Sequence, residues 1–188
     1  MMKPLEVGPG DVLAVAGSND WFAKAIRWFE KIGGRPHQVN HVVIITHQDD
    51  QGRWMGIAGQ PGGVGPADMT KFLTQSQTNT NHYQPRPNDK RQLETLLASC
   101  AKSLGIAYDW VGIAADLADD LHVHDLAEEI DDLWRWPSKD NQLPGHVVCS
   151  SLAASLYEIV GWDHPRRGEE RLVEPGDWWS FNNQFKAS

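Results

Sequence analysis

The sequence has little positive charge and no long apolar run. Its 188 residues carry 17 Lys and Arg against 25 Asp and Glu, which gives a formal net charge of −8. A nucleic-acid binder usually presents a basic face, so we expect no nucleic-acid partner. No stretch is apolar over the length that a membrane span needs. Residues 1–10 are polar and hold two prolines, unlike a secretory signal peptide, so the prediction is a cytoplasmic protein.

Cysteine is also scarce, because Cys100 and Cys149 are the two thiols of the chain. Two cysteines do not make a disulfide framework. Cys100 lies on the apolar face of a helix predicted from residue 88 or 89 to 104, so we expect a buried small hydrophobe there. A cytoplasmic protein keeps its thiols reduced, and we therefore predict that the two cysteines are not bonded to each other.

The sequence lacks the usual patterns of cofactor and metal sites. The glycine-rich stretch 61–66 contains neither a Gly-Lys-Ser/Thr nor a Gly-x-Gly-x-x-Gly pattern, so it is predicted to be a tight loop. His146 and Cys149 have the spacing of half a zinc site, and His122 with His124 is a weaker metal hint. No other Cys or His cluster completes either of them. We expect neither a cofactor nor a metal ion.

The chain is organised around the stretch that begins at Cys149. Apolar residues recur there at helical spacing, and Gly161 suits the left-handed conformation that ends a helix. The spacing predicts a helix from Cys149 to residue 160. At the first turn of a helix, unpaired N–H groups and the helix dipole stabilise a thiolate. Cys149 is therefore a candidate nucleophile, with a buried structural thiol as the alternative.

A histidine opens the most strand-like stretch of the sequence. Residues 41–46 are rich in β-branched side chains and apolar on both faces, which predicts a central buried strand starting at His41. The turn residues 49–52 predict a hairpin back along 53–60. His41 is thus the candidate general base, although a strand-start histidine can also be structural. In a Cys–His pair the thiolate attacks an acyl carbon and the imidazolium protonates the leaving group.

The remaining segments give the predicted organisation of a single domain over 1–188. Residues 116–136 are strongly acidic, and we predict a pair of helices with a solvated acidic face there. The alternative is a lid or a partner-binding insertion near the site. Residues 173–177 echo the turn residues 7–11. The other expectations are a strand over 12–15, a helix over 21–32, a loop or exposed strand over 74–87, and a final strand or aromatic plug at Trp178 and Trp179.

Five short motifs occur in an order that resembles one known family. That family is the circularly permuted NlpC/P60 group of papain-like hydrolases, with its YiiX-like branch, related to the lecithin:retinol acyltransferase family. The motifs are Gly10-Asp11-Val12-Leu13, Asn40-His41-Val42-Val43-Ile44, Gly105-Ile106-Ala107-Tyr108-Asp109-Trp110, Val148-Cys149-Ser150-Ser151-Leu152 and Pro175-Gly176-Asp177.

The resemblance implies a papain-like α+β fold, in which the cysteine helix packs on a small antiparallel sheet that carries the histidine. It also implies hydrolysis or transfer at an amide, thioester or ester. The expected substrates are peptides, isopeptides or acyl-lipids. We take Tyr108 and Trp110 as candidate substrate-binding residues, and core packing is an equal alternative for Tyr108.

One position departs from the family pattern. These hydrolases usually place a polar residue on the strand after the histidine, to orient the imidazole, and the aligned residue here is Ala58. Gln60 lies on the same strand face and could substitute for it. Alternatively the third group is missing, or it was removed by design to trap an inactive form. The sequence therefore supports two hypotheses, a cysteine hydrolase and an inactive papain-like scaffold that binds a ligand or a protein.

Overall fold

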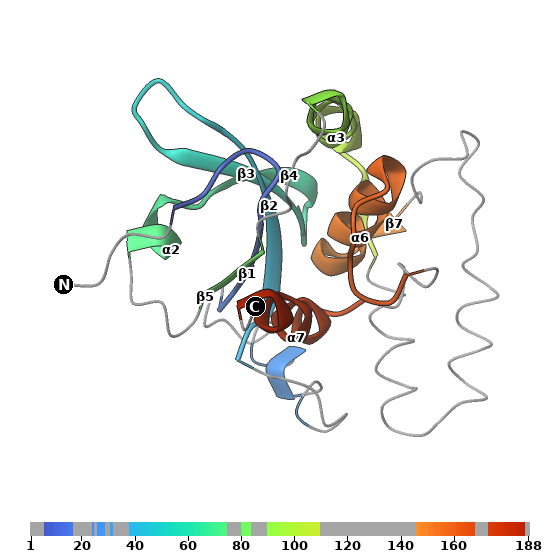
Figure 1. Ribbon diagram of the computed structural model, residues 1–188. Helices are drawn as coiled ribbons and strands as arrows, with labels where there is room; N and C mark the ends of the chain where they lie inside the picture. The colour runs from blue at the N-terminus through green and yellow to red at the C-terminus, as the bar shows by residue number, and fades with distance from the viewer. Residues whose placement is uncertain are drawn as a thin grey trace.

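The chain forms an α+β structure, as predicted, in which helices pack on one small antiparallel sheet (Figure 1). Trp110 and the acidic segment 116–136 lie outside the part of the chain that is described, and so does most of the helix predicted over 21–32. The structure is a computed structural model, and it describes residues 6–16, 24, 26–28, 31, 38–74, 80–83, 90–109, 146–167 and 173–186.

The sheet has five strands in the order β4-β3-β2-β1-β5, and all neighbours are antiparallel. The hairpin predicted after His41 is confirmed, because β2 and β3 pair with Ile44 opposite Ile57. Residues 42–45 of β2 are buried, which also confirms a central strand. The strands are β1 (Val12–Val15), β2 (His41–Gln48), β3 (Trp54–Gln60), β4 (Gly63–Asp68) and β5 (Thr80–Tyr83).

The tight loop predicted over 61–66 was wrong, since most of it forms the start of strand β4. Pro66 pairs with Ile57, and a proline is tolerated there because its missing N–H faces away from β3. On its other side β4 is partly covered by the chain around Ile106, whose carbonyl accepts the Val64 N–H at 2.8 Å. The sequence did not predict this strand, because glycine and proline are typical of turns.

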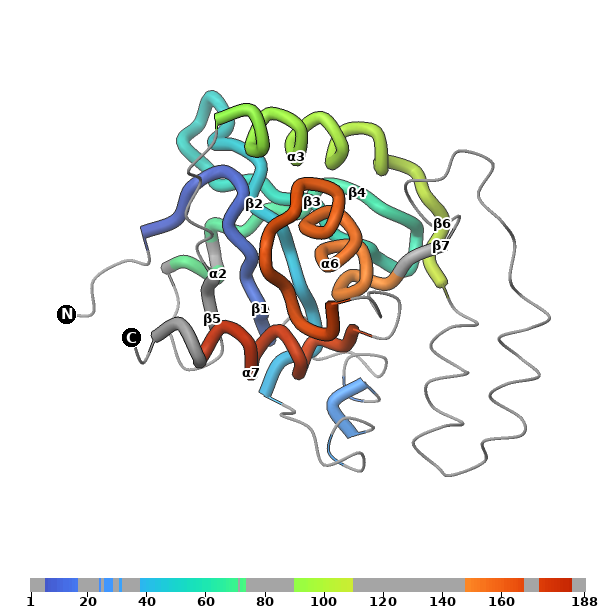
Figure 2. The backbone as a smooth tube through the Cα atoms, turned by 45° about the vertical axis from the view of Figure 1, so that its right-hand side comes forward, coloured from blue at the N-terminus to red at the C-terminus, as the bar shows by residue number. Residues whose placement is uncertain are grey.

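Three longer helices lie on one face of the sheet. Figure 2 shows α6 between α3 and α7, and α6 also contacts β2 and β3. None of the helices in the described ranges is apolar over the length needed to cross a bilayer. The helices are α2 (Thr70–Thr74), α3 (Lys90–Ser103), α6 (Cys149–Val160) and α7 (Pro175–Lys186), and two short parallel strands, β6 (Ala107–Tyr108) and β7 (His146–Val147), precede α6.

The end of the chain is a helix and not the strand that was one of our two expectations. Pro175 opens α7, and its fixed φ and missing N–H suit the first position of a helix. The expectation of an aromatic plug is confirmed, because Trp178 is fully buried against Tyr157 and Phe181.

The similar sequences at residues 7–11 and 173–177 form the same kind of turn. Near the start, the Asp11 carboxylate accepts the Gly8 N–H at 2.8 Å, and the Asp11 N–H is donated to the Gly8 carbonyl at 3.1 Å. At the start of α7 the same two bonds join Asp177 and Glu174, at 3.0 Å and 3.1 Å. Each aspartate therefore closes its own turn by bonding the backbone three residues earlier.

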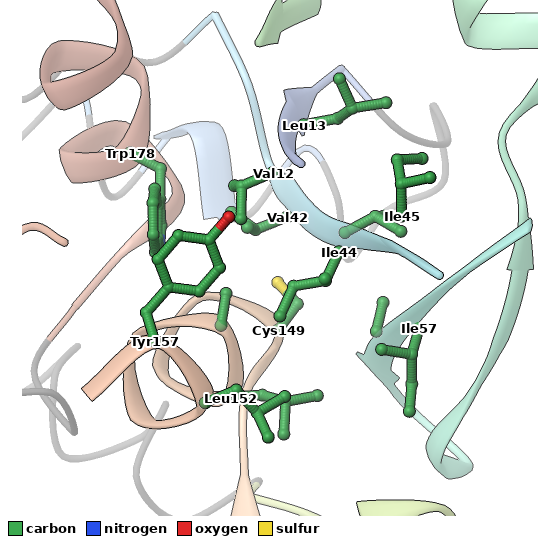
Figure 3. Close-up of a cluster of buried hydrophobic side chains, with 14 of the residues drawn as sticks. Val12, Leu13, Val42, Ile44, Ile45, Ile57, Cys149, Leu152, Tyr157 and Trp178 are labelled. Carbon is green, nitrogen blue, oxygen red and sulfur yellow. The ribbon is translucent and has the colours of Figure 1, made fainter. Parts of the chain in front are cut away.

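Helix α6 runs from Cys149 to Val160, as predicted, and it is buried almost all round. Gly161 ends it with φ of 71°, the left-handed conformation that glycine adopts without steric cost. Figure 3 shows the ring of Tyr157 on α6 directed toward Val12 and Val42 of the sheet. A helix that is apolar on most sides belongs in a core, and α6 is the element on which both α3 and α7 pack.

Tyr157→Phe should lower the free energy of unfolding by about 1–3 kcal/mol, because a buried acceptor then loses its donor. The Tyr157 hydroxyl donates to the carbonyl of buried Gly10, which joins α6 to the turn before β1. Urea denaturation measures the change. Thr95→Ala is the control, since its exposed hydroxyl bonds the Arg91 carbonyl of its own helix. Equal stability of Tyr157→Phe and wild type would show that this bond contributes nothing.

Candidate active site

Cys149 is the first residue of α6, and the residue before it cannot cap the helix. Val148 is the N-cap in an extended conformation, and its side chain has no hydrogen-bonding atom. The Ser151 hydroxyl instead accepts the Val148 N–H at 3.1 Å and donates to the Val148 carbonyl at 3.2 Å. No N-cap side chain therefore competes for the N–H groups of the first turn, where negative charge on sulfur or on a substrate oxygen is stabilised.

The cysteine turn lies directly against strand β3 at Gly59. A Cβ on Gly59 would stand 2.9 Å from the Cys149 amide nitrogen and 3.0 Å from the Val148 carbonyl carbon. No side chain fits at this distance, so glycine is required for the helix to approach the sheet. Because β2 and β3 are antiparallel and pair Ile44 with Ile57, Gly59 lies toward the end of β3 that is nearest the start of β2. Cys149 is thus placed at the start of β2.

Strand alternation separates the two predicted catalytic residues by face. Figure 3 shows the Cys149 sulfur directed toward β2 beside Ile44, with Val42 on the same side. Because side chains alternate along a strand, the Cβ of His41 begins toward the other face, which it shares with Val43. The structure thus brings His41 and Cys149 to the same end of the sheet from opposite faces of β2. Contact between them stays a prediction.

The His41 imidazole is neutral at physiological pH. The residue is partly exposed, yet burial lowers the pKa of its ring to about 4 from the ordinary 6.5, because the charged form loses its hydration. A neutral ring can accept a proton, which is the property that a general base needs. It does not supply the positive charge of a preformed thiolate–imidazolium pair.

The expected third position offers His41 no hydrogen bond. Ala58 is fully buried, and the register of β2 and β3 gives it the same strand face as His41 and Val43. The alternative residue, Gln60, donates its side-chain amide to the Pro66 carbonyl at 3.2 Å, so that amide is held toward β4. The Ala58 side chain has no atom that could orient an imidazole, and its assignment to the orienting position stays a prediction.

Tyr108 lies in the neighbourhood of the cysteine. In the parallel pair of β6 and β7 it stands opposite Val147, two residues before Cys149, and it is buried. Burial raises the pKa of its hydroxyl far above the ordinary 10, and the negative charges of the Cys149 thiolate and Asp109 raise that pKa further. The phenol thus stays protonated and can donate a hydrogen bond. Its burial agrees with the expectation of core packing, and substrate binding by Tyr108 stays a prediction.

The second thiol differs from Cys149 in place and reactivity. Cys100 is buried on α3, as predicted, and burial raises the pKa of its thiol to about 12. Both cysteines are free, which confirms the prediction that they are not bonded to each other. Cys100 therefore serves as an internal standard for an unactivated thiol.

Sequence reasoning missed Gly59 as a site residue. The available signal was a glycine inside a predicted strand, which often marks a close backbone approach. The half zinc site of His146 and Cys149 gains no support, because no group of three or more His, Cys, Asp or Glu that could hold a metal occurs within the described ranges.

Comparison with known proteins adds no relative. No protein-family model matches the chain, and a search of curated proteins likewise finds no match. The likeness to permuted NlpC/P60 hydrolases therefore stays an expectation that rests on the five motifs.

The low pKa of His41 predicts a pH-dependent stability. Between pH 6.5 and 4 the unfolded chain protonates this residue and the folded chain does not, so the free energy of unfolding falls as the pH is lowered through this window. Below pH 4 both states are protonated and this contribution stops changing.

His41→Asn should remove that part of the decline, whereas His47→Asn, on the exposed end of the same strand, should not. Urea denaturation at pH 7 and pH 4.5 measures the difference, and NMR titration of the ring gives its pKa directly. A His41 ring that titrates near 6.5 would contradict the prediction.

Proposed function

We propose that this protein is a papain-like cysteine hydrolase that cleaves an amide, ester or thioester through an acyl-enzyme. Cys149 is the nucleophile and His41 the general base in this proposal. The observation that carries it is the cysteine at the N-terminus of a buried helix, in close contact with the strand hairpin that begins with His41. The α+β arrangement and the motif order support the papain-like assignment.

The proposed reaction uses Cys149, His41, Tyr108 and the first-turn amides of α6. Neutral His41 takes the thiol proton while the Cys149 sulfur bonds the substrate carbonyl carbon. The oxygen that becomes negative accepts hydrogen bonds from first-turn N–H groups of α6, with the Tyr108 hydroxyl as a second donor. The imidazolium then protonates the leaving amine, alcohol or thiol as its bond to carbon breaks. His41 then takes a proton from water as the water oxygen bonds the acyl carbon; the carbon–sulfur bond breaks, the carboxylic acid leaves, and the imidazolium returns the proton to the Cys149 sulfur.

The substrate class follows from the resemblance rather than from the shape of the site. Peptides, isopeptides and acyl-lipids are the proposed substrates. The protein needs no cofactor in this mechanism, because the thiol and the imidazole provide both the nucleophile and the proton transfer.

Two features make the proposed enzyme slow. The His41 ring must reach the sulfur around the start of β2, because strand alternation directs its Cβ away from α6. The ring also lacks a partner at Ala58 that would fix its tautomer, and loss of such a partner costs up to about 10⁴-fold in rate.

The same features favour a second function, a binding module on an inactive scaffold. Ala58 is buried and apolar, and the Gln60 amide is held toward Pro66, so neither orients an imidazole. A cysteine site without an oriented base can still hold an acyl group or a peptide without turnover.

Thiol reactivity separates the two functions. Iodoacetamide should alkylate Cys149 faster than Cys100 at pH 7, because burial keeps the Cys100 thiol protonated up to a pKa of about 12. His41→Ala should slow the Cys149 reaction about 10-fold or more, as removal of a general base does. The matched control is His47→Ala, at the exposed end of the same strand.

Hydrolysis is followed in parallel on p-nitrophenyl esters, acyl-thioesters and isopeptide-linked peptides. Turnover that disappears in Cys149→Ser and His41→Ala supports the hydrolase. Equal, slow alkylation of both thiols together with no turnover of any substrate leaves the binding module.

Ala58→Glu should raise the alkylation rate of Cys149 and any hydrolysis, because a carboxylate beside His41 holds the ring in one tautomer and strengthens it as a base. Ala58→Leu tests size alone and should give no gain. Thermal denaturation shows whether each variant is folded, since position 58 is fully buried. If folded Ala58→Glu protein reacts at the wild-type rate, Ala58 does not occupy the orienting position.

A further inference from the structure

Two hydrogen bonds from the C-terminal segment converge on the residue that follows Cys149. The Ser150 hydroxyl donates to the Val173 carbonyl at 2.5 Å, and the Trp178 indole N–H donates to the Ser150 carbonyl at 3.1 Å. All three residues are buried, with exposed fractions of 1% or less. The first turn of α6 is therefore held from outside by residues 23 and 28 positions further along the chain.

We call the two hydrogen bonds at Ser150 the tethers of the first turn of α6. The tether from Trp178 is held firmly at its α7 end. Trp178 packs edge-on against Tyr157 at 5.5 Å and against Phe181 at 5.7 Å between ring centroids. The residue before it, Asp177, closes the turn at Glu174 and forms a 3.0 Å ion pair with Arg166. The indole cannot move without disturbing both contacts.

The Ser150 carbonyl lies on the peptide whose N–H belongs to Ser151. In a regular helix this carbonyl already accepts the amide four residues later, so the indole is a second donor to it. Hydrogen bonds in series polarise one another, and a peptide whose carbonyl accepts more strongly donates more strongly. The Ser151 N–H is in the first turn, where amides have no partner within the helix and face negative charge at the N-terminus.

We infer that Trp178 is a positioning residue for Cys149, which fixes the first turn of α6 and strengthens its amides toward the thiolate and the substrate oxygen. The inference rests on Cys149 being the nucleophile of the proposed function. It gives α7 a role in the site, although no residue of α7 was a candidate from the sequence.

The chain contains a matched control at the other end of the same helix. Trp162 follows α6, and its indole N–H donates to the Gln92 side chain at 3.1 Å. Its ring packs edge-on against Tyr157 at 5.3 Å, which repeats the contact made by Trp178. Trp162→Phe and Trp178→Phe therefore each remove an indole N–H that donates a hydrogen bond of the same length. The Trp162 bond is at the far end of α6, and the Trp178 bond is next to Cys149.

The experiment measures iodoacetamide alkylation of Cys149 and Cys100 in the full chain from pH 5 to 10. Trp178→Phe should slow the Cys149 reaction at pH 7 about five-fold, the effect of one lost hydrogen bond, and move the midpoint of its pH profile upward. Trp162→Phe should leave both quantities at the wild-type values. General loosening of the core has the opposite sign, because it exposes both buried thiols and speeds their labelling.

An unchanged midpoint in Trp178→Phe, or equal shifts in both variants, overturns the inference. If Trp178→Phe does not fold, Ser150→Ala tests the other tether by the same criterion. Its control is Ser103→Ala, which loses a buried serine bond to the Cys100 carbonyl at 2.8 Å. A shift without hydrolysis in wild type leaves the positioning role and removes the hydrolase. Hydrolysis by the wild type with no shift of the midpoint in Trp178→Phe supports the hydrolase and overturns the positioning role.

Discussion

The close approach of the Cys149 turn to Gly59 is the constraint on which the rest of the structure depends. A side chain at position 59 would stand about 3 Å from the α6 backbone, so the helix could not lie on β3. With α6 in place, the sheet, α3 and α7 each bury apolar surface against it, which supplies most of the stabilisation in a fold of this size. The same contact sets Cys149, the proposed nucleophile, near the start of β2, so the packing and the proposed chemistry share one requirement.

The electrostatics of this end of the sheet favour a neutral resting site. Burial holds the pKa of His41 near 4 and keeps the Tyr108 phenol protonated, so neither residue carries charge at neutral pH. The polar help for a developing anion then comes from backbone amides of α6, which are fixed in direction and need no reorganisation when charge develops. Such a site holds the thiol and the imidazole of the proposed hydrolase, and burial is the cause that keeps this imidazole neutral.

Local chemistry explains which elements were predictable. The helix from Cys149 to Val160 and its Gly161 terminus follow from apolar spacing and from the left-handed freedom of glycine. The β2–β3 hairpin follows from β-branched runs around a turn. The sequence predicts a loop where strand β4 forms, because Gly63 and Pro66 are typical turn residues. Their strand conformation depends on pairing with β3. Helix α7 was missed because two adjacent tryptophans suit a strand as well as a helix.

The sequence by itself determined the buried strand that starts at His41 and the helix that starts at the cysteine. Each of these depends on residues near one another in the chain, where propensity and periodicity act. The tertiary structure decided that Gly59 carries the cysteine turn, that His41 begins on the opposite strand face from the sulfur, and that Trp178 bonds Ser150. These contacts join residues that are distant in the chain, and their geometry follows from how the elements pack, which no local pattern encodes.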